Sequence, residues 1–181
     1  AGLRGFPPDF PWLPLTILDA PRYVDHHFLF HVLQIPFTWF GDLVVGAKLS
    51  AFVYGVAAML ACYGLIVQSR VRWPLVWLVA LLASSSHFMW RMANPRAMSV
   101  TIVTLVLAIW LLFAKRYRWV AVLAFALVWM YSLFPLLLVL AVAWTIGDWW
   151  ESRRLDWRPV AYASIGIALG LVINPYFPEN I

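Results

Sequence analysis

Charged side chains are scarce in this sequence: Asp, Glu, Lys and Arg make up only 12% of the residues, whereas apolar residues make up 64%. A soluble globular domain is roughly half apolar and about a quarter charged. The apolar excess is more than a soluble core needs, so we expect lipid to face most of the surface. Long runs of basic residues are also missing, and no nucleic-acid partner is predicted.

Cysteine is almost absent as well. Cys62 is the single cysteine, so no intramolecular disulfide can form and the sequence does not reveal a redox compartment. The first residues contain no charged start followed by an apolar run, so no signal peptide is predicted. The sequence begins without Met and stops soon after an apolar run, which indicates a part of a longer protein.

Apolar runs divide the sequence into an outer loop and a membrane domain. Residues 1–41 are rich in Pro, aromatic residues and His, and about 24–35 among them are expected to form an amphipathic helix at the interface. Residues 42–181 form the predicted transmembrane domain. Its apolar segments lie at about 43–67, 74–88, 98–113, 119–147 and 159–174. The second and third are shorter than the ~20 residues that cross a ~30 Å hydrocarbon core, and local thinning of the bilayer would accommodate them.

The segment 119–147 can be one long helix kinked at Pro135 or a hairpin of two short helices. Cytoplasmic loops carry an excess of Lys and Arg, and only the hairpin produces such an excess, with eight cations on one side and four on the other. The eight are Arg70, Arg72, Lys115, Arg116, Arg118, Arg153, Arg154 and Arg158, and the four are Arg4, Arg22, Arg91 and Arg96. We therefore predict an all-α, polytopic bundle of about six membrane helices, two of them short. All four histidines then lie on the outer side.

The densest group of chemically active side chains is the stretch from Asp19 to His31. If the chain after Val24 is helical, His27 and His31 are four residues apart and share a face. Asp25 suits the N-cap or first turn, where a carboxylate is favoured. Such a group can bind a divalent metal or supply a general base. The competing interpretation is a capping Asp on an interfacial helix whose histidines face lipid headgroups.

A second group lies between the two predicted short spans and contains His87, Arg91 and Arg96. Arginine binds phosphate through two parallel hydrogen bonds, and a polar group near a membrane marks a functional site by default. A lipid-linked diphosphate or monophosphate is one partner that fits. Ordinary headgroup contact is the alternative.

Small and hydroxyl residues are interpreted as packing elements. Ser84, Ser85 and Ser86, and likewise Tyr131 and Ser132, have no base-and-orienter arrangement around them, so serines that pack helices are expected. The pair Gly166 and Gly170 has the small-residue spacing of a close helix–helix contact.

The order of these features matches a known pattern. An outer loop with aspartates and a His-rich helix ending in Ile35-Pro36-Phe37 precedes a long span. A short hairpin with Arg91 and Arg96 and a pair of short helices follow, and the last span runs into Asn174-Pro175-Tyr176. This order resembles the membrane-embedded glycosyltransferases of the GT-C superfamily, such as oligosaccharyltransferase catalytic subunits and protein mannosyltransferases. The likeness is one of pattern over most of the chain.

The resemblance implies transfer of a sugar, hexosyl or pentosyl, from a polyprenyl-phosphate donor to an acceptor on the outer face of the membrane. An aspartate of the first outer loop acts in that family as base or metal ligand. Asp25, in Tyr-Val-Asp-His-His, matches its position best, and Asp19 is the competitor.

The resemblance also assigns the donor and the metal. Arg91 and Arg96, with His87, would hold the donor phosphate. A divalent metal, Mg²⁺ or Mn²⁺, would be held by Asp25 with the two helical histidines, His27 and His31. The expected location is a bacterial inner membrane with the active side periplasmic, and membrane lipids are the surrounding partners. The family's first helix, later helices and soluble acceptor domain have no counterpart here, so the acceptor is not specified.

Two other function classes compete with the enzyme. A transporter or channel would use the same charges to line a path, and helices broken near a proline such as Pro135 occur in transporters too. It should place those charges near mid-membrane, whereas here nearly all lie at the ends of the apolar segments. A non-catalytic membrane subunit would make the Asp19–His31 group dispensable.

Overall fold

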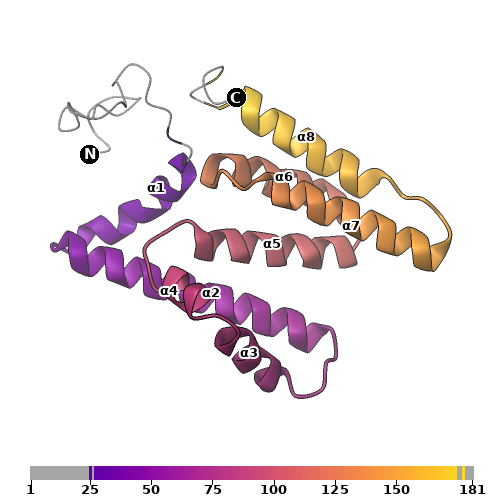
Figure 1. Cartoon of the computed structure of the whole chain (residues 1–181). Coiled ribbons are helices and arrows are strands. Elements are labelled where there is room, and N and C mark those ends of the chain that lie inside the picture. Colours follow the sequence, from indigo (N-terminus) through magenta and orange to yellow (C-terminus); the bar gives the residue numbers. More distant parts are fainter. Residues whose placement is uncertain (1–24, 26, 175–176, 178–181) are drawn as a thin grey trace.

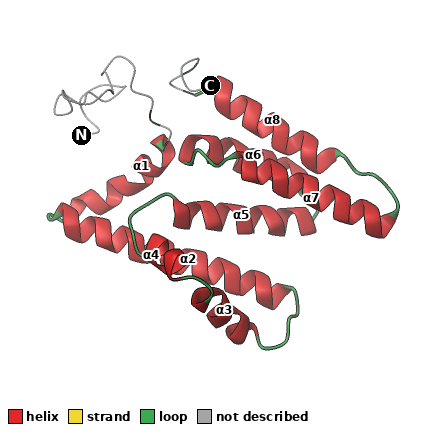
Figure 2. Cartoon of the chain, viewed as in Figure 1, coloured by secondary structure: helices red, strands yellow, loops and turns green. Residues whose placement is uncertain are grey.

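The computed structural model describes residues 25, 27–174 and 177, and all regular structure in this part of the chain is helical (Figures 1 and 2). The elements are α1 (Phe28–Gln34), the 3-10 helix η2 (Ile35–Trp39), α2 (Leu43–Gln68), α3 (Pro74–Ala83), α4 (Ser86–Met92), α5 (Met98–Phe113), α6 (Tyr117–Met130), α7 (Pro135–Ser152) and α8 (Arg158–Val172). The predicted all-α class is therefore confirmed for the described residues. Most of the predicted outer loop, 1–41, lies outside them.

Several helices begin and end where the apolar runs do. α5 covers the predicted segment 98–113, and α2 extends the predicted 43–67 by one residue. The start of α2 is fixed by Asp42, whose carboxylate accepts a hydrogen bond from the backbone N–H of Val44 at 2.7 Å. The helix that we predicted at the interface begins later than expected, at Phe28, and continues as a 3-10 turn that contains Pro36.

The predicted span 74–88 is not one continuous helix: the chain bends by 95° between α3 and α4, which makes the segment a broken span or a re-entrant loop. The serines that we interpreted as packing residues end one helix and start the next. Ser84 Oγ donates to the carbonyl of Leu81 at 2.7 Å, and Ser85 Oγ accepts from the N–H of Phe88 at 3.3 Å. Serine competes with the helical backbone for hydrogen bonds in this way, which favours helix ends.

The segment 119–147 forms two helices, as the hairpin prediction required. α6 ends at Met130, Tyr131 is extended, and Pro135 occupies the first turn of α7. Proline fits that position because its missing N–H would have no partner there. The loops after α2, α5 and α7 consequently lie toward the same end of the molecule, opposite α1 (Figure 1). We call residues 69–73, 114–118 and 148–158 the basic end.

The core is centred on α6, which packs closely on α8. Val120, Ala124 and Leu127 of α6 and Ala163 of α8 are fully buried. A Cβ on Gly166 would overlap the carbonyl oxygen of Ala121, so the two backbones are in direct contact. The predicted close contact through Gly166 and Gly170 is confirmed.

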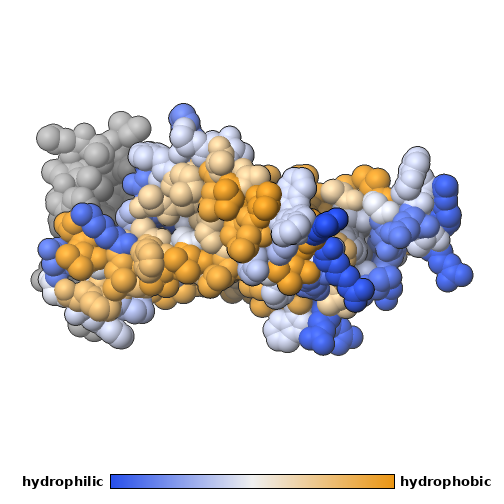
Figure 3. All heavy atoms as spheres, turned by 90° about the horizontal axis from the view of Figure 1, so that it is seen from below, coloured by the Kyte–Doolittle hydropathy of each residue, from blue (hydrophilic) through white to orange (hydrophobic). Residues whose placement is uncertain are grey.

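α2 is the one helix of the described chain that is both long and apolar enough to cross a membrane. Its 26 residues span about 39 Å at ~1.5 Å per residue. The bent pair α3–α4 meets the same criteria only if it is counted as one span, and four shorter apolar helical segments of the described chain have 10–17 residues. Hydrophobic side chains cover the middle of the face shown in Figure 3, and hydrophilic ones gather at the basic end. The six-span bundle stays a prediction.

Helix ends at the basic end have an unusual backbone. Among the described residues, those other than glycine with positive φ are Arg70, Trp73, Lys115 and Arg153. Arg70, Lys115 and Arg153 follow the last turns of α2, α5 and α7. The turn after α5 is typical: the N–H of Lys115 donates to the carbonyl of Leu112 at 3.0 Å, and that of Arg116 donates to Leu111 at 2.8 Å. Glycine normally occupies such a position, since left-handed backbone costs other residues about 1–2 kcal/mol.

Candidate functional site

A cavity of about 460 Å³ lies at the end of the molecule opposite the basic end. Three separate parts of the chain line it: α1 with the residue before it, the α4–α5 connection, and the break between α6 and α7. The lining residues are His27, Phe30, His31, Arg91, Pro95, Arg96, Ala97, Met98, Tyr131 and Ser132. Its volume is within the range of about 300–1,000 Å³ that is usual for small-molecule sites. Members of both groups that the sequence singled out, His27 and His31 of the first and Arg91 and Arg96 of the second, therefore line one cavity.

Asp25 lies directly behind the α1 wall of this cavity. Its side chain is only 7% exposed, and its Oδ2 lies 2.6 Å from Nδ1 of His31. Oδ1 accepts a hydrogen bond from the backbone N–H of His27 at 2.9 Å. The N-cap position itself belongs to His27, so Asp25 precedes the helix and folds back onto it. The sequence did not predict this contact, because residues six apart do not meet within a regular helix.

The pair shifts the pKa of both of its members. Burial by itself would raise the pKa of Asp25, but the hydrogen bonds from His31 and from the His27 backbone, with the positive charge of both imidazoles, bring it below its ordinary 3.8. The hydrogen bond to Asp25 raises the pKa of His31 above its ordinary 6.5, although burial opposes the change. The His31 side chain, which lines the cavity, is 56% exposed.

These shifts predict a pH-dependent stability. The raised pKa of His31 contributes stability that is complete below pH 6.5 and is lost as the pH rises through the folded-state value. The lowered pKa of Asp25 contributes stability above pH 3.8 that is lost on acidification. We expect the melting temperature of wild type to exceed that of His31→Gln most at about pH 5–6, and the excess to shrink by pH 8.5.

Thermal unfolding in detergent across this pH range measures the difference. The double variant Asp25→Asn/His31→Gln serves as control and should follow the single variant, since the partner is already gone. A gap between wild type and His31→Gln that stays constant from pH 5 to pH 8.5 would show that the pair does not titrate as its geometry requires.

Arg91 and Arg96 supply positive charge to another part of the cavity lining. Arg91 comes from α4 and Arg96 from the connection to α5, and both are exposed. The guanidinium of Arg96 lies 5.5 Å from the ring centre of Trp90, which orients it as a cation–π contact. Neither arginine has a carboxylate partner within the described part of the chain. Their charge is therefore available to an anionic ligand in the cavity.

Tyr131 and Ser132 line the cavity, although the sequence gave no reason to join them to the other groups. Tyr131 directly follows the last residue of α6, and its ring centre lies 5.5 Å from that of His27. Side chains at a break between two helices are exposed, whereas in a continuous helix they would pack against neighbouring helices. The signal that pointed to them was the predicted break before Pro135, but nothing in the sequence placed that break beside α1.

Other contacts fix α1 to the bundle. The Tyr54 hydroxyl of α2 donates to the carbonyl of Leu33 at 2.5 Å. Phe28 packs edge-on against Trp129 of α6, with ring centres 5.9 Å apart. α1 is thereby held between α2 and α6, and its histidines face the cavity.

Two predicted site residues are not part of this geometry. His87 lies in the first turn of α4 and is not among the residues that line the cavity. Asp19 lies outside the described residues, as does His26. Their predicted roles stay predictions.

The predicted divalent metal, Mg²⁺ or Mn²⁺, is not supported by the described donor set alone. No three His, Cys, Asp or Glu side chains among residues 25, 27–174 and 177 come together as a metal site. Both oxygens of Asp25 already have partners, in His31 and the His27 backbone. The metal stays a prediction.

Comparisons of this chain with protein families, with characterised proteins and with solved structures found no match. The cavity and its side chains are therefore the basis of any functional assignment.

Proposed function

We propose that this chain is the site-bearing part of a membrane-embedded glycosyltransferase of the GT-C type. It would move a sugar from a polyprenyl-phosphate donor to an acceptor on the outer face of a membrane, which we take to be a bacterial inner membrane. The proposal includes the polytopic bundle of about six membrane helices, of which α2 is the longest. The acceptor stays open.

The observation that carries the proposal is the composition of one cavity. His31 lies on one wall and is hydrogen-bonded to the carboxylate of Asp25 behind it. Two arginines without carboxylate partners, Arg91 and Arg96, lie on another wall within the described chain. Sugar transfer needs both a group that accepts a proton and cationic groups that stabilise a leaving phosphate.

The reaction can be written with these groups alone. The acceptor hydroxyl oxygen forms a bond to the anomeric carbon of the sugar while the bond from that carbon to the phosphate oxygen breaks. The hydroxyl proton passes to the Asp25–His31 pair, in which His31 faces the cavity and Asp25 orients it. The electron pair leaves with the polyprenyl phosphate, whose charge the two arginines would stabilise.

The position of the charges favours an enzyme over a transporter. The cavity lies beside α1 and the breaks between helices, at one end of the bundle. A transporter is expected to hold its substrate near the middle of the membrane, between discontinuous helices. An opening at one end suits a donor whose phosphate lies at headgroup level and whose tail stays in lipid.

The arginine pair provides the test of donor binding. The double variant Arg91→Gln/Arg96→Gln is expected to lower kcat/KM for the donor by about 100-fold or more, because two charge-assisted contacts to phosphate are lost. The measurement is transfer of radiolabel from a polyprenyl-phosphate sugar by membranes that carry the protein. Lys48→Gln, which removes an exposed cation from α2, is the matched control and should transfer normally.

Normal transfer by the double arginine variant would show that the donor phosphate does not bind to the arginines of this cavity. No transfer by wild type with any of a panel of polyprenyl-phosphate sugars would contradict the enzyme itself and favour the transporter.

A further inference from the structure

Three helices, α2, α5 and α7, end at the basic end, and each is followed by a cation in left-handed backbone. Arg70 has φ 53°, Lys115 has φ 54° and Arg153 has φ 58°. Glycine is the common residue at this position, because it alone carries no Cβ penalty there. A cation follows each of α2, α5 and α7 in this position, although glycine would cause less backbone strain. The repetition indicates that these residues are present for their charge and not for their backbone conformation.

A cation near the last turn of a helix also interacts favourably with the helix dipole. That interaction does not require a cation in left-handed backbone, because Lys or Arg in the last helical turn would interact with the dipole equally well. The left-handed residue lies beyond the last turn, where its side chain leaves the bundle. Arg70, Lys115 and Arg153 are all exposed, in agreement with a partner outside the molecule.

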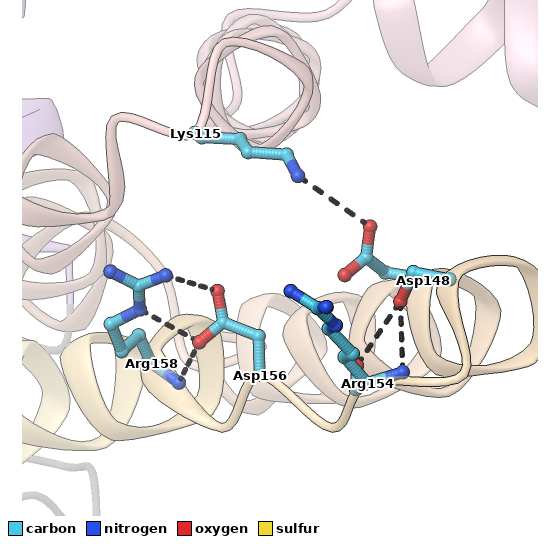
Figure 4. A network of polar contacts seen from close by, with 6 residues as sticks. Lys115, Asp148, Arg154, Asp156 and Arg158 are labelled. Carbon is cyan, nitrogen blue, oxygen red and sulfur yellow. Dashed lines mark hydrogen bonds and ion pairs between the residues drawn. The ribbon is translucent and has the colours of Figure 1, made fainter.

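Most cations of the basic end have no acidic partner in the described structure. Asp156 is engaged with Arg158 through two hydrogen bonds of 2.8 and 2.9 Å, as Figure 4 shows. Lys115 lies 4.0 Å from Asp148, a weak contact that leaves the lysine side chain 66% exposed. The remaining six cations of this end form no ion pair among the described residues. The face therefore carries a surplus of positive charge.

Exposed tryptophans surround these cations. Those at or beside the basic end are Trp73, Trp119, Trp149, Trp150 and Trp157. The guanidinium of Arg72 lies 5.6 Å from the Trp73 ring, and that of Arg153 lies 5.7 Å from the Trp150 ring. Tryptophan gathers at the headgroup level of bilayers, where one part of the ring is apolar and another is wet. This second observation, independent of the backbone, indicates a lipid partner.

We propose that the basic end is a binding surface for anionic phospholipid headgroups, formed by Arg70, Lys115 and Arg153 at the three helix ends within a belt of tryptophans. The phosphates would accept hydrogen bonds from these cations, and the tryptophans would lie among the upper acyl chains. The inference rests on the membrane location in the proposed function and not on sugar transfer.

The test uses the triple variant Arg70→Gly/Lys115→Gly/Arg153→Gly, which removes the three charges and also relieves the left-handed strain. Protein reconstituted in phosphatidylcholine vesicles is probed with spin-labelled phosphatidylglycerol and, separately, spin-labelled phosphatidylcholine. Electron spin resonance gives the relative association of the two lipids. Wild type is expected to prefer phosphatidylglycerol, and the triple variant to lose about fivefold or more of that preference, since one cation at an anionic surface is worth about that factor.

Two controls isolate the charge. The variant Arg70→Lys/Lys115→Arg/Arg153→Lys keeps the three charges and should keep the preference. The glycine variant should melt in detergent at no lower temperature than wild type, because glycine suits left-handed backbone. High salt should weaken the wild-type preference by screening.

An unchanged phosphatidylglycerol preference in the glycine variant would overturn the proposal, and so would equal association of both lipids with wild type. If the protein transfers no sugar but still prefers phosphatidylglycerol, the lipid-binding surface is supported and the proposed enzyme is contradicted.

Discussion

Replacement of Asp25 by Asn is expected to lower sugar transfer by roughly 100-fold or more, with normal insertion and expression. General acid–base groups contribute about 10²–10⁴ to rate, and Asn cannot accept the proton or hold His31 in the same orientation. The side chain keeps its size, so the cavity wall should survive. Label transfer from a polyprenyl-phosphate sugar measures the effect on kcat and KM separately.

Two further aspartates complete this experiment. Asp42→Asn is the matched control, because Asp42 caps α2 at the same end of the molecule and Asn is an equally good capping residue. Asp42→Asn should transfer at the wild-type rate. Asp19→Asn tests the competing carboxylate. Loss of transfer in Asp19→Asn, with full activity in Asp25→Asn, would show that the Asp25–His31 pair is not the general base.

The largest effect on stability is expected at Gly166, where α8 touches the backbone of α6. A Cβ added there would overlap the Ala121 carbonyl and lie 2.8 Å from the Cβ of Ala124. The neighbouring atoms belong to backbone and to a fully buried side chain, so they have little room to move. Overpacking of this kind costs about 1–3 kcal/mol, and Gly166→Ala should lose that much free energy of unfolding.

Gly147→Ala is the matched control for this substitution. Gly147 is also inside a helix, α7, but no atom lies within 4 Å of the Cβ that it would gain. Alanine there should stabilise the helix by about 0.5–1 kcal/mol. Reversible unfolding in mixed micelles compares the two. Equal stability of Gly166→Ala and Gly147→Ala would mean that α6 and α8 are not in backbone contact.

The sequence predicted the fold best for helices whose limits depend on the length of an apolar run. The limits of α2 and α5 and the division of 119–147 follow from apolar runs, charge between them and Pro135. The bend between α3 and α4 was missed because three serines in an apolar segment suit both a packed helix and a broken one. Only the hydrogen bonds of Ser84 and Ser85 distinguish the two.

The candidate site was predictable in its parts and not in its assembly. Residue type and helical spacing singled out His27, His31, Arg91 and Arg96. The sequence contains no local signal that α1 lies beside the α4–α5 connection, because that proximity depends on packing between distant segments. The Asp25–His31 contact was missed for a related reason: it depends on how the chain turns before the first residue of α1.

The measurement that tests the account most directly is photo-cross-linking of the donor to the protein. A polyprenyl phosphate with a diazirine next to its phosphate is bound to wild type, activated by light, and located by peptide mass spectrometry. We expect the label within residues 91–98 and at Tyr131 or Ser132, with competition by unlabelled donor. Label confined to the basic end, or label that excess donor does not displace, would contradict a donor site in this cavity.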